Sequence, residues 1–236
     1  MYQFDTRIRY SEVDMNGKLT LPALLNYFQD SSSFHSESEG VGVQFLKNRQ
    51  CSWVLVSWQI VIKDMPAFCD TVTVQTWPYE FKRFLGGRNF CMQSESGEPL
   101  AWANTIWTYL DLQNGHPAKV SEEELQAYKL EEKFDMEYAP RKITVSGECE
   151  ELPGFSVMRH HLDTNHHVNN VQYVQMAMDF LPEGFGIGQM RAEYRKEALL
   201  GNMIIPQVYL RENVCTVLLC DEEKNPYAVV EFTGKE

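Results

Sequence analysis

The sequence lacks the features that mark several large classes of protein. Positive charge is scarce: 21 Lys and Arg stand against 33 Asp and Glu, a formal net charge of −12 over 236 residues. This balance argues against a nucleic-acid partner, because a phosphate backbone is bound by concentrated positive charge. No apolar run approaches the ~20 residues that span a bilayer, and residues 1–7 lack the basic and apolar segments of a signal peptide. We therefore expect a cytoplasmic protein without a membrane span.

Two kinds of short motif are also missing. The six cysteines form no CxxC pair, and several lie in apolar runs such as residues 214–220. This placement is typical of buried free thiols in a reducing compartment. The chain contains no GxSxG nucleophile elbow, no P-loop and no GxGxxG motif. What it does contain, 44% hydrophobic and 12% aromatic residues, is the composition of a globular protein of one or two domains.

The first half of the chain predicts one helix and then several strands. Thr20 is a suitable N-cap, and Pro22 suits the first turn of a helix that Gly40 would end. Apolar residues recur there with helical spacing, at Leu21, Leu24, Leu25 and Phe28. Strand-like runs follow at Ser52–Ile62, Thr71–Trp77, Phe84–Ser94 and Leu100–Asp111. This order favours an α+β fold in which an antiparallel sheet packs on a helix.

The pattern restarts after a connecting region. Ser121 and Glu124 fit a capping box, and the charged segment Lys129–Pro140 is predicted to be a surface linker. Beyond it the sequence predicts a strand at Phe155–His161 and a helix at Asn169–Phe180. Further strands are expected at Gln189–Tyr194, Met203–Leu210, Val214–Asp221 and Pro226–Phe232.

A short motif precedes the expected helix in both halves. Residues 13–19 read Val-Asp-Met-Asn-Gly-Lys-Leu, and residues 162–168, 149 positions later, read Leu-Asp-Thr-Asn-His-His-Val. An apolar residue, then Asp-x-Asn, then a helix expected to be of similar length recur in the same order. This favours a duplicated unit over coincidence. Because Lys18 stands where His167 stands in the second copy, chemistry is expected in the second half.

Asp163, Asn165 and His167 are the most informative polar residues. In an extended segment these three positions point the same way. An acid, an amide and an imidazole would then converge before a helix N-terminus as a hydrolytic set. The spacing leaves a second interpretation equally open, in which Asp163 and Asn165 only make turn and cap hydrogen bonds. Four histidines fall within residues 160–167, but a metal site is disfavoured because they include no helical HExxH pair.

A second charged segment lies at residues 190–197. If it is a strand, one face carries alternating charges, from Arg191, Glu193, Arg195 and Glu197. From the residues alone, a salt-bridged face exposed to solvent is favoured over a functional role.

These segments resemble the motifs of one family. Residues 163–173 are similar to DxNxHVNNxxY and residues 194–197 to YRRE or YRKE, the signatures of the bacterial acyl-acyl-carrier-protein thioesterases. Further similar stretches, at residues 58–62, 65–66, 76–78, 87–90 and 101–107, extend the resemblance over nearly the whole chain. It implies a tandem, or double, hotdog fold, each domain a long central helix wrapped by an antiparallel β-sheet. Residues 1–135 would hold a non-catalytic domain with the acyl-chain pocket and end in a linker, and residues 136–236 the catalytic domain.

The resemblance also implies a reaction. It is hydrolysis of the thioester of a fatty acyl-acyl carrier protein, which releases free fatty acid and terminates chain elongation without a cofactor or metal. The implied catalytic residues are Asp163, Asn165, His167 and Glu197. Some plant members carry Cys where this chain has Ala198, so a water mechanism with Glu197 as general base is favoured. Asp163 and His167 would orient or polarise Glu197 and the water, and Asn165 would hold the thioester carbonyl.

Some questions stay open from the sequence. An acyl-CoA thioesterase and a non-hydrolytic acyl-binding or dehydratase-like hotdog protein are alternatives, because the fold hosts several activities. Candidate pocket residues, which could equally be plain core, are Trp53, Trp58, Phe84 and Phe90. An acidic acyl carrier protein requires a local basic patch on a like-charged enzyme; the candidates are Lys82, Arg83 and Arg88, or Arg191, Arg195 and Lys196. Both a monomer and a homodimer are compatible with the sequence.

Overall fold

The computed structural model describes residues 1–235, which divide into two compact units. The first comprises Met1–Val56 and Ile60–Tyr138, and the second comprises Ser57–Gln59 together with the chain from Ala139 onward. Each unit combines helix with an antiparallel sheet, so the expected α+β class is confirmed. No helix within residues 1–235 is long and apolar enough to cross a membrane.

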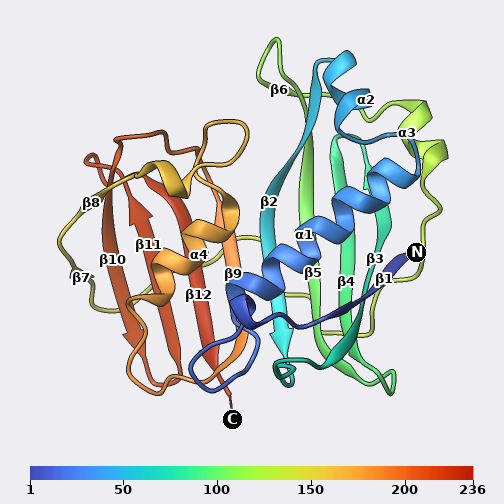
Figure 1. The fold of residues 1–236 in the computed structure, drawn as a ribbon. Coiled ribbons are helices and arrows are strands. Elements are labelled where there is room, and N and C mark those ends of the chain that lie inside the picture. Colours follow the sequence, from blue (N-terminus) through green and yellow to red (C-terminus); the bar gives the residue numbers. More distant parts are fainter. Residues whose placement is uncertain (236) are drawn as a thin grey trace. The chain divides into compact units, whose positions relative to one another are not determined.

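The first unit places its main helix on one sheet. The chain runs through β1 (Tyr2–Arg7), the 3₁₀ helix η1 (Tyr10–Glu12), α1 (Leu21–Ser38), α2 (Val43–Asn48), β2 (Cys51–Ile62), β3 (Thr71–Lys82), β4 (Leu85–Ser94), β5 (Pro99–Asp111), β6 (His116–Pro117) and α3 (Glu122–Ala127). The strand order is β1-β3-β4-β5-β2, and β6 pairs with β5. The strands from β1 through β3 and β4 to β5 pair antiparallel, and α1 crosses their face (Figure 1).

Helix α1 forms where its caps and its apolar spacing predict it. The Thr20 side chain accepts a hydrogen bond from the Ala23 N–H at 3.3 Å, which satisfies one free donor of the first turn. The apolar face is fully buried at Leu24, Leu25 and Phe28. The ring of Phe28 packs at 5.3 Å between centroids on Phe90 of β4, which joins the helix to the sheet.

The second unit repeats this arrangement with a shorter helix. Its elements are β7 (Glu150–Glu151), β8 (Phe155–Ser156), the 3₁₀ helix η2 (Arg159–His161), α4 (Asn170–Met178), β9 (Ile187–Tyr194), β10 (Met203–Arg211), β11 (Val214–Cys220) and β12 (Pro226–Gly234). The strand order is β9-β12-β11-β10-β7, with β8 also on β10. All these pairs are antiparallel. Helix α4 crosses this sheet (Figure 1).

The strand expected over Phe155–His161 is wrong beyond Ser156. The next residues form η2, in which the His161 N–H donates to Met158 O at 3.0 Å and the Met158 N–H donates to His161 Nδ1 at 3.0 Å. These local bonds close a tight turn, whereas the alternation of side chains suggested an extended segment. The turn leads the chain into the segment that carries the candidate site.

The expectation that the two helices are of similar length is wrong. Helix α1 has 18 residues and α4 has 9. After α4 the chain continues in tighter turns, with the Phe180 N–H on Ala177 O at 3.2 Å, and Pro182 follows. A residue that precedes proline is disfavoured in the helical conformation, which explains the early end.

All six cysteines are free. Cys91, Cys215 and Cys220 are buried, as their apolar surroundings in the sequence predict, whereas Cys69 and Cys149 are exposed.

Candidate active site

A tight turn closed by an aspartate precedes α1 in the first unit. Asp14 Oδ1 accepts hydrogen bonds from the backbone N–H groups of Asn16 at 2.9 Å and Lys18 at 3.0 Å. The Asp14 N–H in turn donates to Lys18 O at 2.8 Å. The bond from the Lys18 N–H lowers the pKa of the Asp14 carboxyl despite some desolvation. Gly17 has a φ of 72°, in the left-handed region that glycine adopts without strain.

The same turn precedes α4 in the second unit. Asp163 Oδ1 accepts from the N–H groups of Asn165 at 2.7 Å and His167 at 3.3 Å, and the Asp163 N–H donates to His167 O at 2.8 Å. His166 takes the left-handed position of the first-unit glycine, with a φ of 64°. The extended geometry that would aim Asp163, Asn165 and His167 the same way is therefore wrong, and the turn interpretation holds for Asp163.

Each turn is fixed against a neighbouring segment in the same register. The N–H that follows the turn donates to the carbonyl of Pro66 at 2.9 Å in the first unit and of Ala198 at 3.0 Å in the second. The residues just before these carbonyls are therefore equivalent. They are Met65 in the first unit and Glu197 in the second.

This register brings an imidazole and a carboxylate together in the second unit. His167 Nε2 lies 3.3 Å from Glu197 Oε2, and the two side chains are 33% and 61% exposed, so water reaches the pair. At the equivalent place in the first unit, Lys18 Nζ donates to the Met65 carbonyl at 2.8 Å and lies 3.6 Å from Asp64. The first unit therefore lacks both members of the pair.

The charged segment before Glu197 has a different role. Arg191 pairs with Glu231 at 2.8 Å across the sheet, and Arg195 pairs with Glu193 at 3.2 Å. These contacts agree with a salt-bridged face. Strand β9 ends at Tyr194, however, so Glu197 leaves that face and is free to meet His167.

A buried tyrosine supports the segment that carries Glu197. The Tyr173 hydroxyl on α4 accepts a hydrogen bond from the Ala198 N–H at 3.0 Å. Burial raises the pKa of Tyr173, so the hydroxyl stays protonated. The residue pattern alone does not single out Tyr173 as a supporting residue; its one signal in the sequence is its place as the last residue of the 163–173 motif. Ala198 is itself buried.

The four predicted site residues therefore differ in their surroundings. His167 and Glu197 contact each other, and Asp163 is bound to the backbone of His167. Asn165 is exposed. Its backbone N–H donates to the Asp163 carboxylate, and its side-chain amide makes no hydrogen bond with residues 1–235. The arrangement can activate a water molecule at the imidazole–carboxylate pair, with a free amide nearby in the sequence.

The cluster of histidines does not assemble into a metal centre in the described chain. No group of three or more His, Cys, Asp or Glu side chains in residues 1–235 could hold a metal ion. The ring centroids of His160 and His161 are 4.1 Å apart, and His161 Nδ1 accepts a hydrogen bond from the Met158 N–H.

Comparison with protein families gives two matches along the chain. Residues 1–128 match the model of the acyl-ACP thioesterase N-terminal domain, and residues 146–225 match that of the C-terminal domain. A chloroplastic palmitoyl-acyl carrier protein thioesterase of Arabidopsis thaliana is 24% identical over 207 residues, 80% of this chain and 50% of the relative. A chloroplastic dodecanoyl-[acyl-carrier-protein] hydrolase of Cinnamomum camphora is 24% identical over 214 residues, 84% of this chain and 56% of the relative. The chain thus spans about half the length of the curated relatives it matches.

Solved structures with the same fold cover the chain from end to end. An acyl-ACP thioesterase from Bacteroides thetaiotaomicron superposes with a TM-score of 0.91 at 22% identity, covering 99% of this chain and 97% of its own. A 12:0-ACP thioesterase from Umbellularia californica gives a TM-score of 0.85 at 20% identity, covering 99% and 96%. At these identities the likeness concerns the fold, and the expected double hotdog is confirmed.

Proposed function

The chain belongs to the acyl-ACP thioesterase family, and from this we propose that it hydrolyses the thioester of fatty acyl-acyl carrier protein and releases free fatty acid. The observation that carries the proposal is the contact between His167 Nε2 and Glu197 Oε2, at 3.3 Å. His167 lies on a turn that occurs twice in the chain, and Glu197 lies on the segment that the turn contacts; the first copy has Lys18 and Met65 at the equivalent positions. A pair of this kind, open to water, suits the activation of a nucleophilic water.

In the proposed reaction Glu197 is the general base. It takes a proton from a water molecule whose oxygen attacks the thioester carbonyl carbon, and the C=O π electrons move to the oxygen. When the carbonyl re-forms, the C–S bond breaks and the thiolate leaves with the bonding electrons. A thiol has a reference pKa of ~8.5, so the leaving group requires no strong acid, and it accepts the proton from Glu197. The products are a fatty acid and the thiol of the carrier.

The remaining three residues have supporting roles in this proposal. His167 polarises the water and holds Glu197, and Asn165 donates its free side-chain amide to the thioester carbonyl. Asp163 acts as a positioning residue, because its carboxylate binds the backbone N–H of His167 at 3.3 Å and that of Asn165 at 2.7 Å. Its effect on the reaction would therefore come through the geometry of the turn.

The two domains have different roles in the proposal. Residues 1–135 bind the acyl chain and do no chemistry, and residues 136–236 carry the reaction. Support for the first part comes from a pocket within the first unit that is lined by Trp53. The other three pocket candidates do not line it: Trp58 and Phe90 are buried in the core, and Phe84 is 37% exposed.

The proposed partner is an acidic acyl carrier protein, which needs exposed basic residues. Arg88 does not qualify because it is only 8% exposed. Lys82 and Arg83 of the same candidate patch are exposed and form no ion pair within residues 1–235. The second candidate patch is neutralised: Arg191, Arg195 and Lys196 pair with Glu231, Glu193 and Asp221. Arg159, exposed on η2 in the same unit as the catalytic pair, also has no acidic partner among residues 1–235. Replacing Arg159 with Glu should raise KM for carrier-protein substrates and leave KM for acyl-pantetheine unchanged.

The decisive experiment is thiol release from acyl carrier protein and acyl-CoA substrates, measured side by side. Glu197→Ala and His167→Ala should each lower kcat by ~10²–10⁴-fold while the far-UV circular dichroism stays unchanged. Lys18→Ala and Met65→Ala, at the equivalent places in the first unit, are the matched controls and should keep nearly full activity. Near-full activity of Glu197→Ala would refute the water mechanism. Preference for CoA would favour the acyl-CoA thioesterase, and absence of thiol release would favour a dehydratase-like or binding protein.

A further inference from the structure

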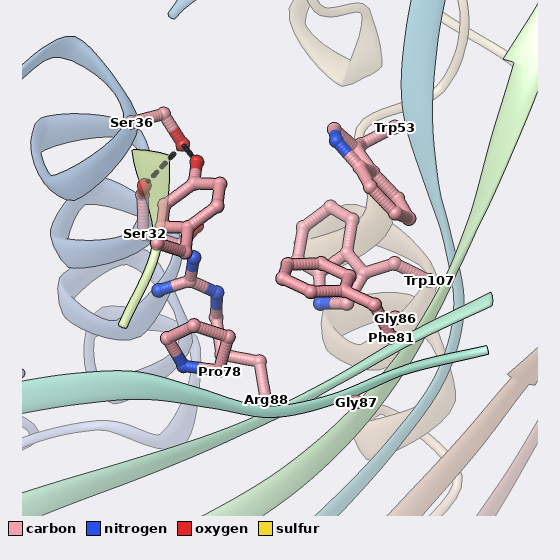
Figure 2. A pocket seen from close by; sticks show the side chains of 10 residues that line it. Ser32, Ser36, Trp53, Pro78, Phe81, Gly86, Gly87, Arg88 and Trp107 are labelled. Carbon is pink, nitrogen blue, oxygen red and sulfur yellow. Dashed lines mark hydrogen bonds between the residues drawn. The ribbon is translucent and has the colours of Figure 1, made fainter. Parts of the chain in front are cut away.

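The first unit contains a pocket whose two sides differ in chemistry (Figure 2). Ser32 and Ser36 of α1 and Arg88 of β4 lie on one side, and the rings of Trp53, Phe81 and Trp107 face them from the other. The cavity measures about 60 Å³, room for roughly four to six water-sized groups. A ligand segment that enters it therefore meets an aromatic wall and a guanidinium at once.

The guanidinium of Arg88 is a buried charge with neutral hydrogen-bond partners. Its side chain is 8% exposed, and Nη1 binds His35 Nδ1 at 3.0 Å and Thr76 Oγ1 at 3.1 Å. Burial lowers the pKa of His35 to about 3, so the imidazole is neutral and accepts from the arginine. The Tyr128 ring lies 5.4 Å from Cζ. No carboxylate of residues 1–235 forms an ion pair with Arg88.

Arg88 is also the polar group of this pocket with donors to spare. The Tyr128 hydroxyl donates to Ser36 Oγ at 2.7 Å, and Ser36 and Ser32 bind carbonyls of their own helix. A guanidinium has five N–H donors. Nη1 makes both hydrogen bonds given above, and the Tyr128 side chain is a third, neutral partner, which leaves other donors for a ligand. A buried cation that lacks a counter-charge is unfavourable, so an oxygen acceptor brought in by a ligand would be bound strongly.

The opposite wall offers no comparable polar group. The indole N–H of Trp53 is occupied by the buried carboxylate of Glu124 at 2.8 Å, and that of Trp107 by Thr105 Oγ1 at 2.8 Å. The two indole rings are therefore held in place by hydrogen bonds to neighbouring residues, and they present apolar surface to the cavity. The pocket matches a ligand that is apolar along its length and carries one oxygen acceptor.

We propose that this pocket selects acyl chains that carry an oxygen acceptor, a hydroxyl, keto or carboxylate group, and that Arg88 is the residue that determines this selectivity. The inference rests on the proposed function only in taking the ligand to be the acyl chain of a thioester substrate. A plain alkyl segment in the same place would leave the guanidinium buried against hydrocarbon, which disfavours the unsubstituted chain.

The test compares octanoyl, 3-hydroxyoctanoyl, 8-hydroxyoctanoyl and 7-carboxyheptanoyl thioesters of one carrier protein. The wild type should have a higher kcat/KM for at least one oxygenated chain than for octanoyl, on the order of 10- to 100-fold, the range of a charge-assisted hydrogen bond. Arg88→Met should abolish that ratio, and Lys119→Met, an exposed cation of the same unit, should preserve it. A wild-type preference for plain octanoyl, or an equal ratio in Arg88→Met, overturns the proposal.

Two additions keep the result independent of folding and of the proposed reaction. If Arg88→Met does not fold, the proposal is still tested by the kcat/KM ratio of oxygenated to plain chains in the wild type and in the charge-retaining variant Arg88→Lys. In the Glu197→Ala protein, binding of the same thioesters is followed by tryptophan fluorescence, because Trp53 and Trp107 line the pocket. Tighter binding of an oxygenated chain without thiol release by the wild type would uphold the pocket and reject the hydrolase. Thiol release without such selectivity would support the hydrolase and reject the proposed role of the pocket.

Discussion

The duplicated turn allows a matched pair of substitutions that separates structural from catalytic effects. Asp14 and Asp163 each accept two backbone hydrogen bonds, at 2.9 and 3.0 Å in the first unit and at 2.7 and 3.3 Å in the second. A hydrogen bond contributes about 0.5–1.5 kcal/mol net. Because neither carboxylate is buried, we expect Asp14→Ala and Asp163→Ala each to lower the free energy of unfolding by about 1–2 kcal/mol. For a chain of this size that corresponds to roughly 2–8 °C in Tm.

Activity should distinguish the two substitutions. Loss of Asp163 frees the backbone of His167, and a shift of about 1 Å between reacting groups can cost ~10²-fold in rate. We therefore expect Asp163→Ala to lower kcat by about 10²-fold, while Asp14→Ala, in the unit without the pair, stays within about twofold of the wild type. The assays are urea unfolding and steady-state thiol release, the latter at a temperature well below both unfolding transitions.

A third variant tests how Asp163 acts. In Asp163→Asn the amide oxygen can still accept the N–H groups of Asn165 and His167, so the turn keeps its bonds and loses only the charge. A positioning role predicts that Asp163→Asn retains most of the activity that Asp163→Ala loses. Equal inactivity of both variants would mean that the negative charge itself takes part in the reaction. Equal losses of kcat in Asp14→Ala and Asp163→Ala would refute the reasoning, because the effect would then be general destabilisation.

Other predictions concern burial and close packing. Burial lowers the pKa of His35 to about 3 in the folded protein, so the unfolded chain binds more protons between pH 6.5 and 3. Stability should fall by up to about 1.4 kcal/mol for each pH unit below 6.5, and His35→Gln should reduce that slope in urea unfolding at pH 7 and 5. Tyr173→Phe leaves the Ala198 N–H without its acceptor and should lower kcat. The control is Tyr194→Phe, which should not lower kcat, because the Tyr194 hydroxyl donates to a helix carbonyl at 3.0 Å and does not contact Ala198. A Cβ at Gly86 would approach two aromatic rings of the pocket to 3.1–3.3 Å, so Gly86→Ala should lower kcat/KM for long acyl chains more than for short ones. Unchanged chain-length profiles would contradict that reading of the pocket.

Much of the fold could be predicted because it depends on local patterns. Thr20, Pro22 and the apolar spacing at Leu24 and Phe28 place α1, and burial follows that spacing. The long strands were found for a similar reason, since β-branched and aromatic residues alternate along them, as in Thr71–Trp77. These features act within a few residues, so a sequence displays them directly.

The site was harder to predict because its geometry depends on side chains that bind the backbone. The Asp163 carboxylate closes a turn, and period-two reasoning about Asn165 and His167 fails once the chain is no longer extended. The first copy held a usable signal. Gly17 occupies a left-handed position, φ 72°, and its counterpart His166 must do the same, φ 64°. An Asp-x-Asn-Gly sequence is typical of a turn. Because the two copies are equivalent, the first copy predicts the same turn at residues 163–167 of the second.

The internal duplication also explains how two distant residues can be singled out without any relative for comparison. The turn and its register against the neighbouring segment are common to both units, since the same carbonyl, of Pro66 or of Ala198, accepts the N–H that follows the turn. Differences at equivalent positions are therefore not required by the turn itself. Lys18 against His167 and Met65 against Glu197 are such differences. Within each unit the two positions are in contact, although they are at least 30 positions apart in the sequence. A scaffold that tolerates a lysine and a methionine there has no structural need for an imidazole beside a carboxylate, which makes chemistry the better explanation of the pair.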